Sequence, residues 1–549
     1  MVQPSADDTF IVHGAPAPED LTLGARSLGE LFLKVLRKTP NAVALVDGVT
    51  GREYTYAEVL KCSCLLAGYL KDHNIKRGDV VAIVAENRSE YPITIIALLL
   101  VGASVALFNP SYTARELVHA LNVAGPKMIF FSSLARSALL QASRSVKQSF
   151  NVISYDALER GTTYGQCLQR SSTRYTTDSF QPDPVDIADE VAIIVMSSGT
   201  TGLPKGVLIT HRNVMATMAN VRGALEKGLP LHCSLDVLPW FHVAGGLSMV
   251  SWLGANLTVV YLPRFDPHTY LRCIERYRPS FLNMVPPIVV FLAKHPAVAE
   301  YDLSSVQTIA CGAAPLSREV EALISARLPN IRIRQGYGMS ETTQAITFYD
   351  GDTLKPGSIG KVRAGQSGKV VDPDTGRALG PDQHGELCFK GTLIMKGYIG
   401  GERVIDADGW LHTGDIGYYD ADGDFFIVDR LKELIKYKAF QVAPAELEAL
   451  LLSHPGVKDC AVVGKTDERV GELPTAFVVR AEGTSVTETQ LMQYVEARVS
   501  NEKRLRGGVT FVEEIPKTAS VHSTRRKNMY YVGFLARCKK LCQTGYEVV

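Results

Sequence analysis

The sequence predicts an α/β fold, with a large N-terminal domain of layered sheets, a small β-rich unit and a small α+β domain. A chain of 549 residues is too long for one ordinary core, so two or more domains are expected. Through the first 350 residues, short apolar runs alternate with longer amphipathic stretches, which is typical of helices packed on parallel sheets. Beyond Asp350, glycine and aspartate become dense and turn signals recur about every 8 to 12 residues, which indicates the β-rich unit.

Five apolar runs predict buried strands: VVAIVAEN near residue 80, KMIFFSS near 127, VAIIVMSSG near 191, ANLTVVYL near 255 and TIACGAAP near 308. Helical patterns cover Ala57–Asp72 and Asp266–Arg278. The uncharged stretch Pro92–Phe108 is at the short limit for a membrane span and contains a proline and a glycine. We therefore expect a buried helix that ends at Val101–Ala103, followed by a buried strand over Ser104–Phe108.

The pattern changes again after Asp429, where a compact α+β domain is expected. Pro444, followed by early carboxylates, marks a helix start, and the runs DCAVVGKTD and LPTAFVVRAEG predict two strands. A further helix is predicted over Thr487–Val499. We place the N-terminal domain at residues 1–429, with the β-rich unit from about 351, and the C-terminal domain at 430–549.

Composition and charge exclude several classes of protein. The formal net charge is +1, which gives no reason to expect a nucleic-acid partner. The ten cysteines are scattered without zinc-site spacing or a disulfide framework, and the acidic N-terminus lacks a signal pattern, so we expect a cytoplasmic protein without a membrane span. The tail at 521–549 carries six basic side chains and one acidic one; we expect it to be solvated rather than bound to an anionic surface.

The segment Ser197–Gly206, with the sequence SSGTTGLPKG, follows an apolar strand, where phosphate-cradling turns lie in α/β proteins. Its three glycines permit close approach of backbone amides to phosphate oxygens, its four hydroxyls add donors, and Lys205 adds a positive charge. It is not a P-loop of the G-x-x-x-x-G-K-[ST] type, and Gly464-Lys465-Thr466 fails the same test because Asp459 replaces the first glycine. We predict that this loop binds a polyphosphate.

Further segments follow in a fixed order: NPSYTARE at 109–116, PWFHVAGG at 239–246, CGAAP at 311–315, QGYGMSETT at 335–343, WLHTGDIGYYD at 410–420 and VDRLKELIKYKAFQVAPAELE at 428–448. Together with the loop, they resemble the adenylate-forming superfamily of acyl-CoA ligases, firefly luciferase and peptide-synthetase adenylation domains. The resemblance spans roughly residues 25 to 520 and is strongest to 4-coumarate–CoA ligases. It implies that the β-rich unit is barrel-like and that the C-terminal domain is mobile, rotating about Asp429 between two half-reactions.

The resemblance implies a site for ATP and Mg²⁺. The residues implied to bind ATP or AMP are Ser197, Ser198, Gly199, Thr200, Thr201, Gly202, Lys205, Gly312, Ala313, Ala314, Gln335, Gly336, Tyr337, Gly338, Ser340, Asp415 and Arg430. The small side chains at 312–314 leave a slot for a flat base that Tyr337 covers, and Asp415 suits the two ribose hydroxyls. Glu341 is the expected Mg²⁺ ligand, since Mg²⁺ favours one or two carboxylates together with phosphate oxygens and water. The implied catalytic residues are Lys205, Glu341, Lys436 and His522.

A second group is implied to bind the acid and CoA, namely His242, Val243, Ala244, Lys438, Ala439 and Gln441. His242 resembles a gate residue of the acyl pocket. Coumarate ligases usually have Ile-Tyr after it and an Asn nearby, whereas this chain continues Val-Ala-Gly-Gly-Leu, which removes polar partners and is expected to widen the pocket. An apolar, aryl or polyketide-like acid is therefore expected. Ala439 replaces the usual glycine and is expected to strain or narrow the thiol tunnel.

The largest departure is at the terminal motif, which in the family reads P-K-T-A-S-G-K. Here Val521 replaces the glycine and His522 replaces the lysine that bridges carboxylate and phosphate. Histidine is shorter and mostly neutral near pH 7, and loss of one transition-state contact costs roughly 10²- to 10³-fold in rate. Three explanations stay open: slow adenylation, replacement by Arg525 or Lys527 after a register shift, or an altered reading frame after Ser520.

The expected activity is that of an acid–CoA ligase acting in secondary metabolism, using ATP, Mg²⁺ and CoA. Two alternatives stay open: transfer of the acyl group to a carrier-protein thiol, and a catalytically impaired nucleotide- or acyl-binding homologue.

Overall fold

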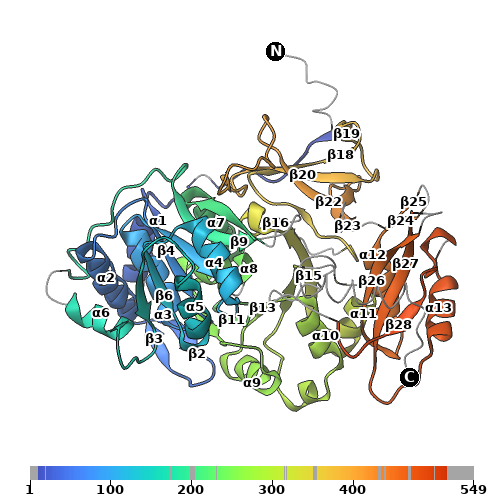
Figure 1. Cartoon of the computed structure of the whole chain (residues 1–549), viewed down its shortest axis with the longest axis horizontal. Helices are drawn as coiled ribbons and strands as arrows, with labels where there is room; N and C mark the ends of the chain where they lie inside the picture. Colours follow the sequence, from blue (N-terminus) through green and yellow to red (C-terminus); the bar gives the residue numbers. More distant parts are fainter. Residues whose placement is uncertain are drawn as a thin grey trace.

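The computed structural model describes residues 10–18, 20–171, 175–197, 204–229, 231–313, 316, 318–349, 355–430, 435–437, 440–467, 471–499 and 501–515 (Figure 1). The described part is built from three sheets of the N-terminal domain, a β-rich unit drawn in gold in Figure 1, and a C-terminal domain drawn in red. The predicted α/β class with a barrel-like unit and a small C-terminal domain is confirmed.

The largest sheet has eight strands in the order β21 (Gly397–Tyr398), β10 (Lys205–Thr210), β9 (Val191–Ser197), β5 (Ser104–Phe108), β4 (Val80–Val84), β6 (Met128–Phe131), β7 (Asn151–Ser154) and β8 (Thr162–Thr163). A four-stranded sheet has the order β11 (Cys233–Asp236), β12 (Thr258–Tyr261), β2 (Val43–Asp47) and β3 (Glu53–Thr55). A third has the order β13 (Phe281–Met284), β14 (Thr308–Cys311), β15 (Arg332–Gly338), β16 (Ala345–Phe348) and β17 (Lys361–Val362). The five predicted runs thus contain β4, β6, β9, β12 and β14.

The helices of the N-terminal domain are α1 (Leu28–Lys38), α2 (Tyr56–Asp72), α3 (Glu90–Leu100), α4 (Ala114–Ala124), α5 (Arg136–Ser143), α6 (Tyr164–Arg170), α7 (His211–Glu226), α8 (Val243–Gly254), α9 (Pro267–Tyr277), α10 (Pro286–Lys294) and α11 (Arg318–Arg327). The predicted helices at 57–72 and 266–278 correspond to α2 and α9. Capping explains where α2 begins, because the Thr55 hydroxyl accepts from the Glu58 amide while the Glu58 carboxylate accepts from the Thr55 amide.

The β-rich unit is an antiparallel sheet in the order β1 (Val12–His13), β18 (Gln366–Val371), β20 (Gly385–Gly391), β22 (Leu411–Tyr419) and β23 (Phe425–Arg430), with β19 (Ala378–Leu379) beside β18. The C-terminal domain has the order β25 (Phe440–Val442), β24 (Ile435–Tyr437), β27 (Gly471–Arg480) and β26 (Val457–Asp467), with β28 (Val509–Phe511) beside β27. Its helices are α12 (Pro444–Ser453) and α13 (Glu488–Glu496), so the predicted helix at 487–499 ends three residues early.

The stretch Pro92–Phe108 is core, as predicted. Helix α3 ends at Leu100, β5 begins at Ser104, and both are almost fully buried. No helix in the described part of the chain is long and apolar enough to cross a bilayer.

The largest sheet is mixed, whereas the sequence pattern indicated only parallel sheets. Strands β9, β5, β4, β6, β7 and β8 run parallel, but β10 pairs antiparallel with β9, and β21 antiparallel with β10. Only residues 198–204 separate β9 from β10. A parallel partner would need a crossover of about a dozen residues, so this short connection makes a hairpin.

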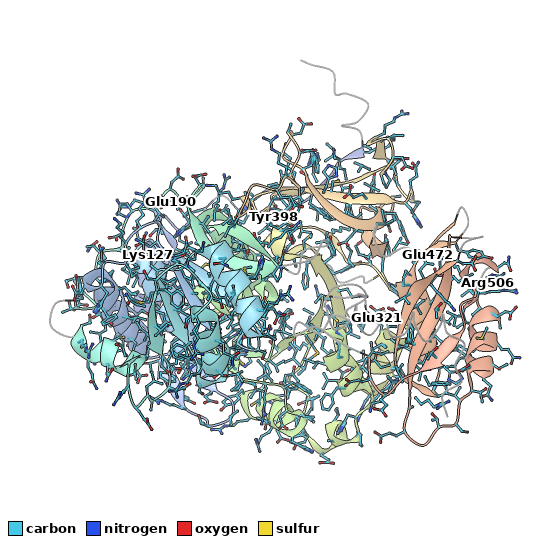
Figure 2. All side chains as sticks on the ribbon, viewed as in Figure 1. Lys127, Glu190, Glu321, Tyr398, Glu472 and Arg506 are labelled. Atoms are coloured by element: carbon cyan, nitrogen blue, oxygen red, sulfur yellow. The ribbon has the colours of Figure 1, made fainter. Side chains whose placement is uncertain are left out.

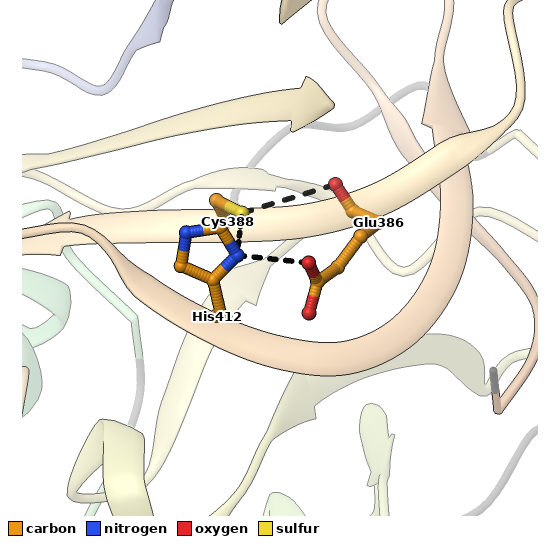
Figure 3. A group of neighbouring side chains, drawn as sticks. All are labelled: Glu386, Cys388 and His412. Atoms are coloured by element: carbon orange, nitrogen blue, oxygen red, sulfur yellow. Dashed lines mark hydrogen bonds and ion pairs between the residues drawn. The ribbon is translucent and has the colours of Figure 1, made fainter. Parts of the chain in front are cut away.

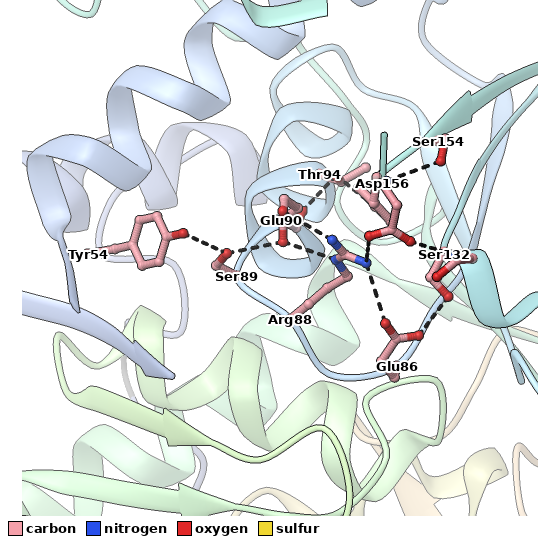
Figure 4. Close-up of polar contacts among 11 residues, drawn as sticks. Tyr54, Glu86, Arg88, Ser89, Glu90, Thr94, Ser132, Ser154 and Asp156 are labelled. Carbon is pink, nitrogen blue, oxygen red and sulfur yellow. Dashed lines mark hydrogen bonds and ion pairs between the residues drawn. The ribbon is translucent and has the colours of Figure 1, made fainter. Parts of the chain in front are cut away.

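Beyond the carboxyl end of β4, Arg88 is held by three carboxylates (Figure 4). Its guanidinium lies 3.0 Å from an Asp156 oxygen, 3.1 Å from Glu90 and 3.4 Å from Glu86. The Asp156 carboxylate also accepts the Ser133 amide at 2.6 Å. The Arg88 side chain is only 17% exposed, and these carboxylates raise its pKa. The cluster fixes the loop after β4 to the strand that precedes Asp156.

Arg88→Met should destabilise the N-terminal domain by about 3 kcal/mol, because it leaves three clustered carboxylates without their cation. The urea unfolding midpoint measures this loss. Arg26→Met is the matched control: Arg26 pairs with Glu30 but its side chain is 84% exposed, so a change within about 0.5 kcal/mol is expected. Equal midpoints for the two variants would contradict the structural role of Arg88.

Candidate active site

Lys205 is the first residue of β10 and lies opposite Ser197, the last residue of β9. The predicted phosphate loop therefore connects two antiparallel strands. Its residues Ser198, Gly199, Thr200, Thr201 and Gly202 lie outside the described residues. The pairing of Ser197 with Lys205 places Lys205 where the loop joins β10, and its ammonium forms an ion pair with Glu402.

Glu341 lies in the short 3₁₀ helix η4 (Ser340–Thr342) that follows β15. Its side chain is buried, and the Tyr398 hydroxyl donates to its carboxylate at 2.6 Å. Tyr398 belongs to β21, at the junction between the N-terminal sheets and the β-rich unit (Figure 2), and Lys205 Nζ lies 5.1 Å from its ring centroid. Burial and the neighbouring Glu341 carboxylate raise the pKa of Tyr398, so it stays a hydrogen-bond donor. Tyr398 thus contacts both predicted residues, Lys205 through its ring and Glu341 through its hydroxyl.

Tyr337 joins the third sheet to the β-rich unit. It lies near the end of β15 and donates from its hydroxyl to Asp415 Oδ2 at 2.7 Å, and Asp415 is on β22. Asp415 lies within β22 directly after Gly414, whose φ of +71° is a conformation that favours glycine, and the Asp415 amide donates to Thr413 Oγ1 at 3.1 Å. The predicted base cover and the predicted ribose contact are therefore in direct contact.

A Glu–His–Cys cluster lies on β20 and β22 and supports the backbone before Asp415 (Figure 3). One oxygen of Glu386 accepts the Gly414 amide at 2.9 Å, and the other lies 2.8 Å from His412 Nδ1. Cys388 Sγ is 3.5 Å from the same nitrogen. A zinc ion bound tetrahedrally by both would separate the Glu oxygen and the His nitrogen by about 3.3 Å, so the 2.8 Å contact is a hydrogen bond. Glu386 thus supports the backbone before Asp415, a role that nothing in the sequence indicated.

The predicted base slot lies between β14 and β15. Gly312 is tightly placed, since a Cβ there would be 3.2 Å from the Gly336 carbonyl oxygen, and Ala313 has φ +71°. A Cβ at Gly338 would be 1.9 Å from the Gln344 carbonyl oxygen, so only glycine fits. Gln335 was predicted to contact the nucleotide. Its side-chain amide instead accepts from the Leu316 amide and donates to the Leu316 carbonyl, which holds the backbone at Leu316 in place.

His242 is half-buried and caps α8, with its Nδ1 accepting the Ala244 amide at 3.3 Å. Desolvation lowers its pKa to about 4, so the ring is neutral at pH 7. Val243 is buried and Ala244 half-buried. The expectation that small residues widen the pocket is wrong for Gly245 and Gly246, because a Cβ there would be 2.4 Å from the Pro239 and Trp240 carbonyl oxygens. These glycines allow α8 to pack closely on residues 238–240.

A polar cluster that the sequence analysis missed lies beside α8. Ser248, on α8, accepts from Asn283 Nδ2 at 3.1 Å and from Gln344 Nε2 at 2.7 Å. Asn283 and Gln344 are half-buried, and Gln344 follows Glu341 by three residues. The sequence does carry a signal for this cluster, because Asn283 interrupts an apolar strand and Ser248 interrupts an apolar helix.

Several predicted residues cannot be placed. Ala314, Lys438, Ala439 and His522 lie outside the described residues, as do the side chains of Arg430, Lys436 and Gln441. The backbone of Arg430 is opposite Asp415 in the β22–β23 pair.

Comparison with known proteins decides the family. The family of AMP-binding enzymes matches residues 32–399, and the C-terminal domain of AMP-binding enzymes matches residues 446–521. The chain belongs to the adenylate-forming AMP-binding superfamily. The match to the C-terminal domain ends one residue before His522.

Individual relatives cover most of this superfamily member. A luciferin 4-monooxygenase of Nipponoluciola cruciata is 42% identical over 87% of this chain and 89% of its own length. A 4-coumarate–CoA ligase of Petroselinum crispum is 37% identical over 88% and 90%. ATP-bound MatB from Rhodopseudomonas palustris has a TM-score of 0.81 at 26% identity, covering 94% of this chain and 99% of its own. The o-succinylbenzoate CoA synthetase of Bacillus subtilis with ATP and magnesium has a TM-score of 0.76 at 26% identity, covering 90% and 98%.

His242→Asn should flatten the pH dependence of stability between pH 7 and pH 5. The folded pKa of about 4 lies below the value near 6.5 of an unfolded histidine, so the unfolded chain binds the proton first as the pH falls. His242 therefore removes about 2 kcal/mol of stability at pH 5 relative to pH 7. Asparagine keeps an N-cap acceptor without titrating. Urea unfolding at both pH values measures the difference, with exposed His268→Asn as the control; an unchanged slope in H242N would contradict the assignment.

Proposed function

We propose that this adenylate-forming enzyme is an ATP-dependent carboxylic acid–CoA ligase. The observation that supports this most is the placement of two neighbouring sets of contacts: Tyr398 contacts both Lys205 and Glu341, and Tyr337, four residues before Glu341, donates to Asp415. These contacts involve the groups predicted for the triphosphate, the metal, the base and the ribose. One nucleotide spans these functions, and the solved relatives hold ATP.

The proposed reaction has two steps. A carboxylate oxygen of the acid attacks the α-phosphorus of ATP, the bond to the β-phosphate oxygen breaks, and pyrophosphate leaves with Lys205 neutralising its charge. The thiolate of CoA then attacks the acyl carbon and AMP leaves with the electron pair of the C–O bond. Glu341 fits an Mg²⁺ site because it offers a buried hard oxygen ligand, and the ion when bound would neutralise phosphate charge. Asp415 orients the ribose, and Tyr337 stays fixed against it.

The remaining predicted residues belong to this proposal. We assign the phosphate loop, Gly312–Ala314, Gln335–Gly338, Ser340 and Arg430 to the nucleotide, and His242–Ala244 to the acid. Lys436, Lys438, Ala439 and Gln441 are assigned to the adenylate and the CoA thiol. His522 occupies the position of the catalytic lysine.

Among the acids expected from the sequence, we favour an aryl acid that carries a hydroxyl or amino substituent. Ser248 lies on the helix that His242 begins, and Asn283 and Gln344 converge on it next to η4. Ser248 is buried, but the Asn283 and Gln344 amides beside it are only half-buried and can offer hydrogen bonds to a polar substituent. A wholly apolar acid is therefore no longer favoured.

The experiment compares the wild type with Val521→Gly/His522→Lys in acid-dependent exchange of pyrophosphate into ATP. The acids are matched aryl pairs with and without a hydroxyl. We expect exchange with hydroxylated acids in the wild type and a roughly 10²-fold gain in the double variant, because a fixed positive charge returns. Addition of CoA should release AMP and give a thioester, detected by its mass.

Each other outcome has a meaning. Exchange without CoA-dependent AMP release would favour a carrier-protein thiol. Binding of an acyl-AMP analogue without exchange in either variant would favour an impaired homologue. No gain in the double variant would contradict the importance of position 522, and exchange with only unsubstituted acids would contradict the assignment of the polar cluster.

A further inference from the structure

The segment Lys396–Glu402 crosses the base of the phosphate-loop hairpin. The Lys396 amide donates to the Leu208 carbonyl at 2.9 Å, and the Ile399 amide to the Gly206 carbonyl at 2.8 Å. Between them, Tyr398 pairs with Val207 in the β21–β10 ladder. The segment is therefore an additional edge strand, held by backbone hydrogen bonds to the strand that begins with Lys205.

Two side chains of this segment engage the two charged groups of the proposed nucleotide site. Tyr398 donates to Glu341 at 2.6 Å, and the Glu402 carboxylate pairs with the Lys205 ammonium. The cation proposed for the triphosphate is thus paired with an anion of the same chain.

A triphosphate and Glu402 compete for Lys205. Both carry negative charge, and placing both against one ammonium brings like charges together, which disfavours simultaneous binding. Their relative exposure shows which partner leaves: the Glu402 side chain is 51% exposed, whereas that of Lys205 is 18% exposed and starts from a paired strand. Glu402 returns to water at little cost, since an exposed ion pair corresponds to about a two- to fivefold effect on an equilibrium.

The backbone before Glu402 allows such a movement. Gly400 and Gly401 have φ values of +95° and +80°, and a Cβ at either would meet no atom within 4 Å. Two adjacent glycines in open space permit backbone rearrangement without a steric cost, while Tyr398 stays in the ladder. The turn can therefore move while the strand that holds Tyr398 remains in place.

We propose that Glu402 is a positioning residue that acts as a displaceable counter-ion of Lys205. It holds the lysine at the base of the phosphate loop until ATP arrives, is displaced by the triphosphate, and returns to the lysine when pyrophosphate leaves. The role rests on the proposed function, because it assigns Lys205 to the triphosphate. It implies that Glu402 lowers the affinity for both ATP and pyrophosphate and so favours product release.

The test is calorimetric titration of the full chain with ATP·Mg²⁺ and, separately, with pyrophosphate·Mg²⁺. Glu402→Gln should bind each about two- to fivefold more tightly than the wild type, because the competing charge is gone. The matched control is Asp189→Asn. Asp189 is also exposed, and its carboxylate pairs at 2.7 Å with Lys396 of the same segment, away from Lys205. D189N removes the same charge and should leave both affinities unchanged.

Steady-state kinetics give a second readout that a merely structural role would not produce. E402Q should lower the KM for ATP and strengthen product inhibition by pyrophosphate by the same factor, without raising kcat. Equal or weaker affinity of E402Q relative to D189N, at matched thermal unfolding midpoints, would overturn the proposal. A wild type that binds ATP but activates no acid would contradict the proposed function alone. The ratio of the ATP affinities of E402Q and the wild type would still decide the role of Glu402.

Discussion

The site depends on the position of β10 between β9 and β21. Strand β9 extends the parallel sheet, β10 returns antiparallel to it through the phosphate-loop hairpin, and β21 adds from the β-rich unit. The packing is close at Gly206, where a Cβ would be 2.7 Å from Ile399 Cδ1, so a larger residue would push β21 away. Separation of β21 from β10 would take Tyr398 from Glu341 and Glu402 from Lys205. This ladder therefore couples the phosphate loop, η4 and the β-rich unit.

A second constraint is the hydrogen bond between Tyr337 and Asp415. It ties the end of β15 to Asp415 in β22, and Glu386 holds the preceding residue by accepting the Gly414 amide. The carboxylate of Asp415 is thus placed by one side chain from the third sheet and by the backbone of the β-rich unit. Neither unit would position it alone, which explains why the site lies where the sheets meet.

The sequence predicts most of the fold because local patterns determine it. Buried strands such as β4 and β14 are continuous apolar runs, and α2 begins at a capping box. The reversal at β10 was missed, since strand periodicity carries no direction; the short connection between Ser197 and Lys205 was the available signal. Family motifs led to Lys205, Glu341, Tyr337 and Asp415, and their roles stay predictions.

The partners of these residues could not be predicted from the sequence. Glu402 is distant from Lys205 along the chain, and Glu386 lies between ordinary residues of a β-strand, so only tertiary contacts show what each one does. Gly245 and Gly246 illustrate the opposite error. Small residues suggest open space in a sequence, but here they allow α8 to approach the backbone of residues 239–240. A glycine in an apolar helix can mean close packing as readily as a wider pocket.

The proposed function requires a nucleotide site assembled from β10, η4, β15 and β22. The most direct measurement is the affinity for ATP·Mg²⁺ of the wild type and of Asp415→Asn, which keeps an acceptor for Tyr337 but cannot accept from both ribose hydroxyls. We predict saturable one-to-one binding by the wild type, weakened about tenfold or more in D415N by loss of charge-assisted hydrogen bonds. Equal affinities, or no binding by the wild type, would contradict the account.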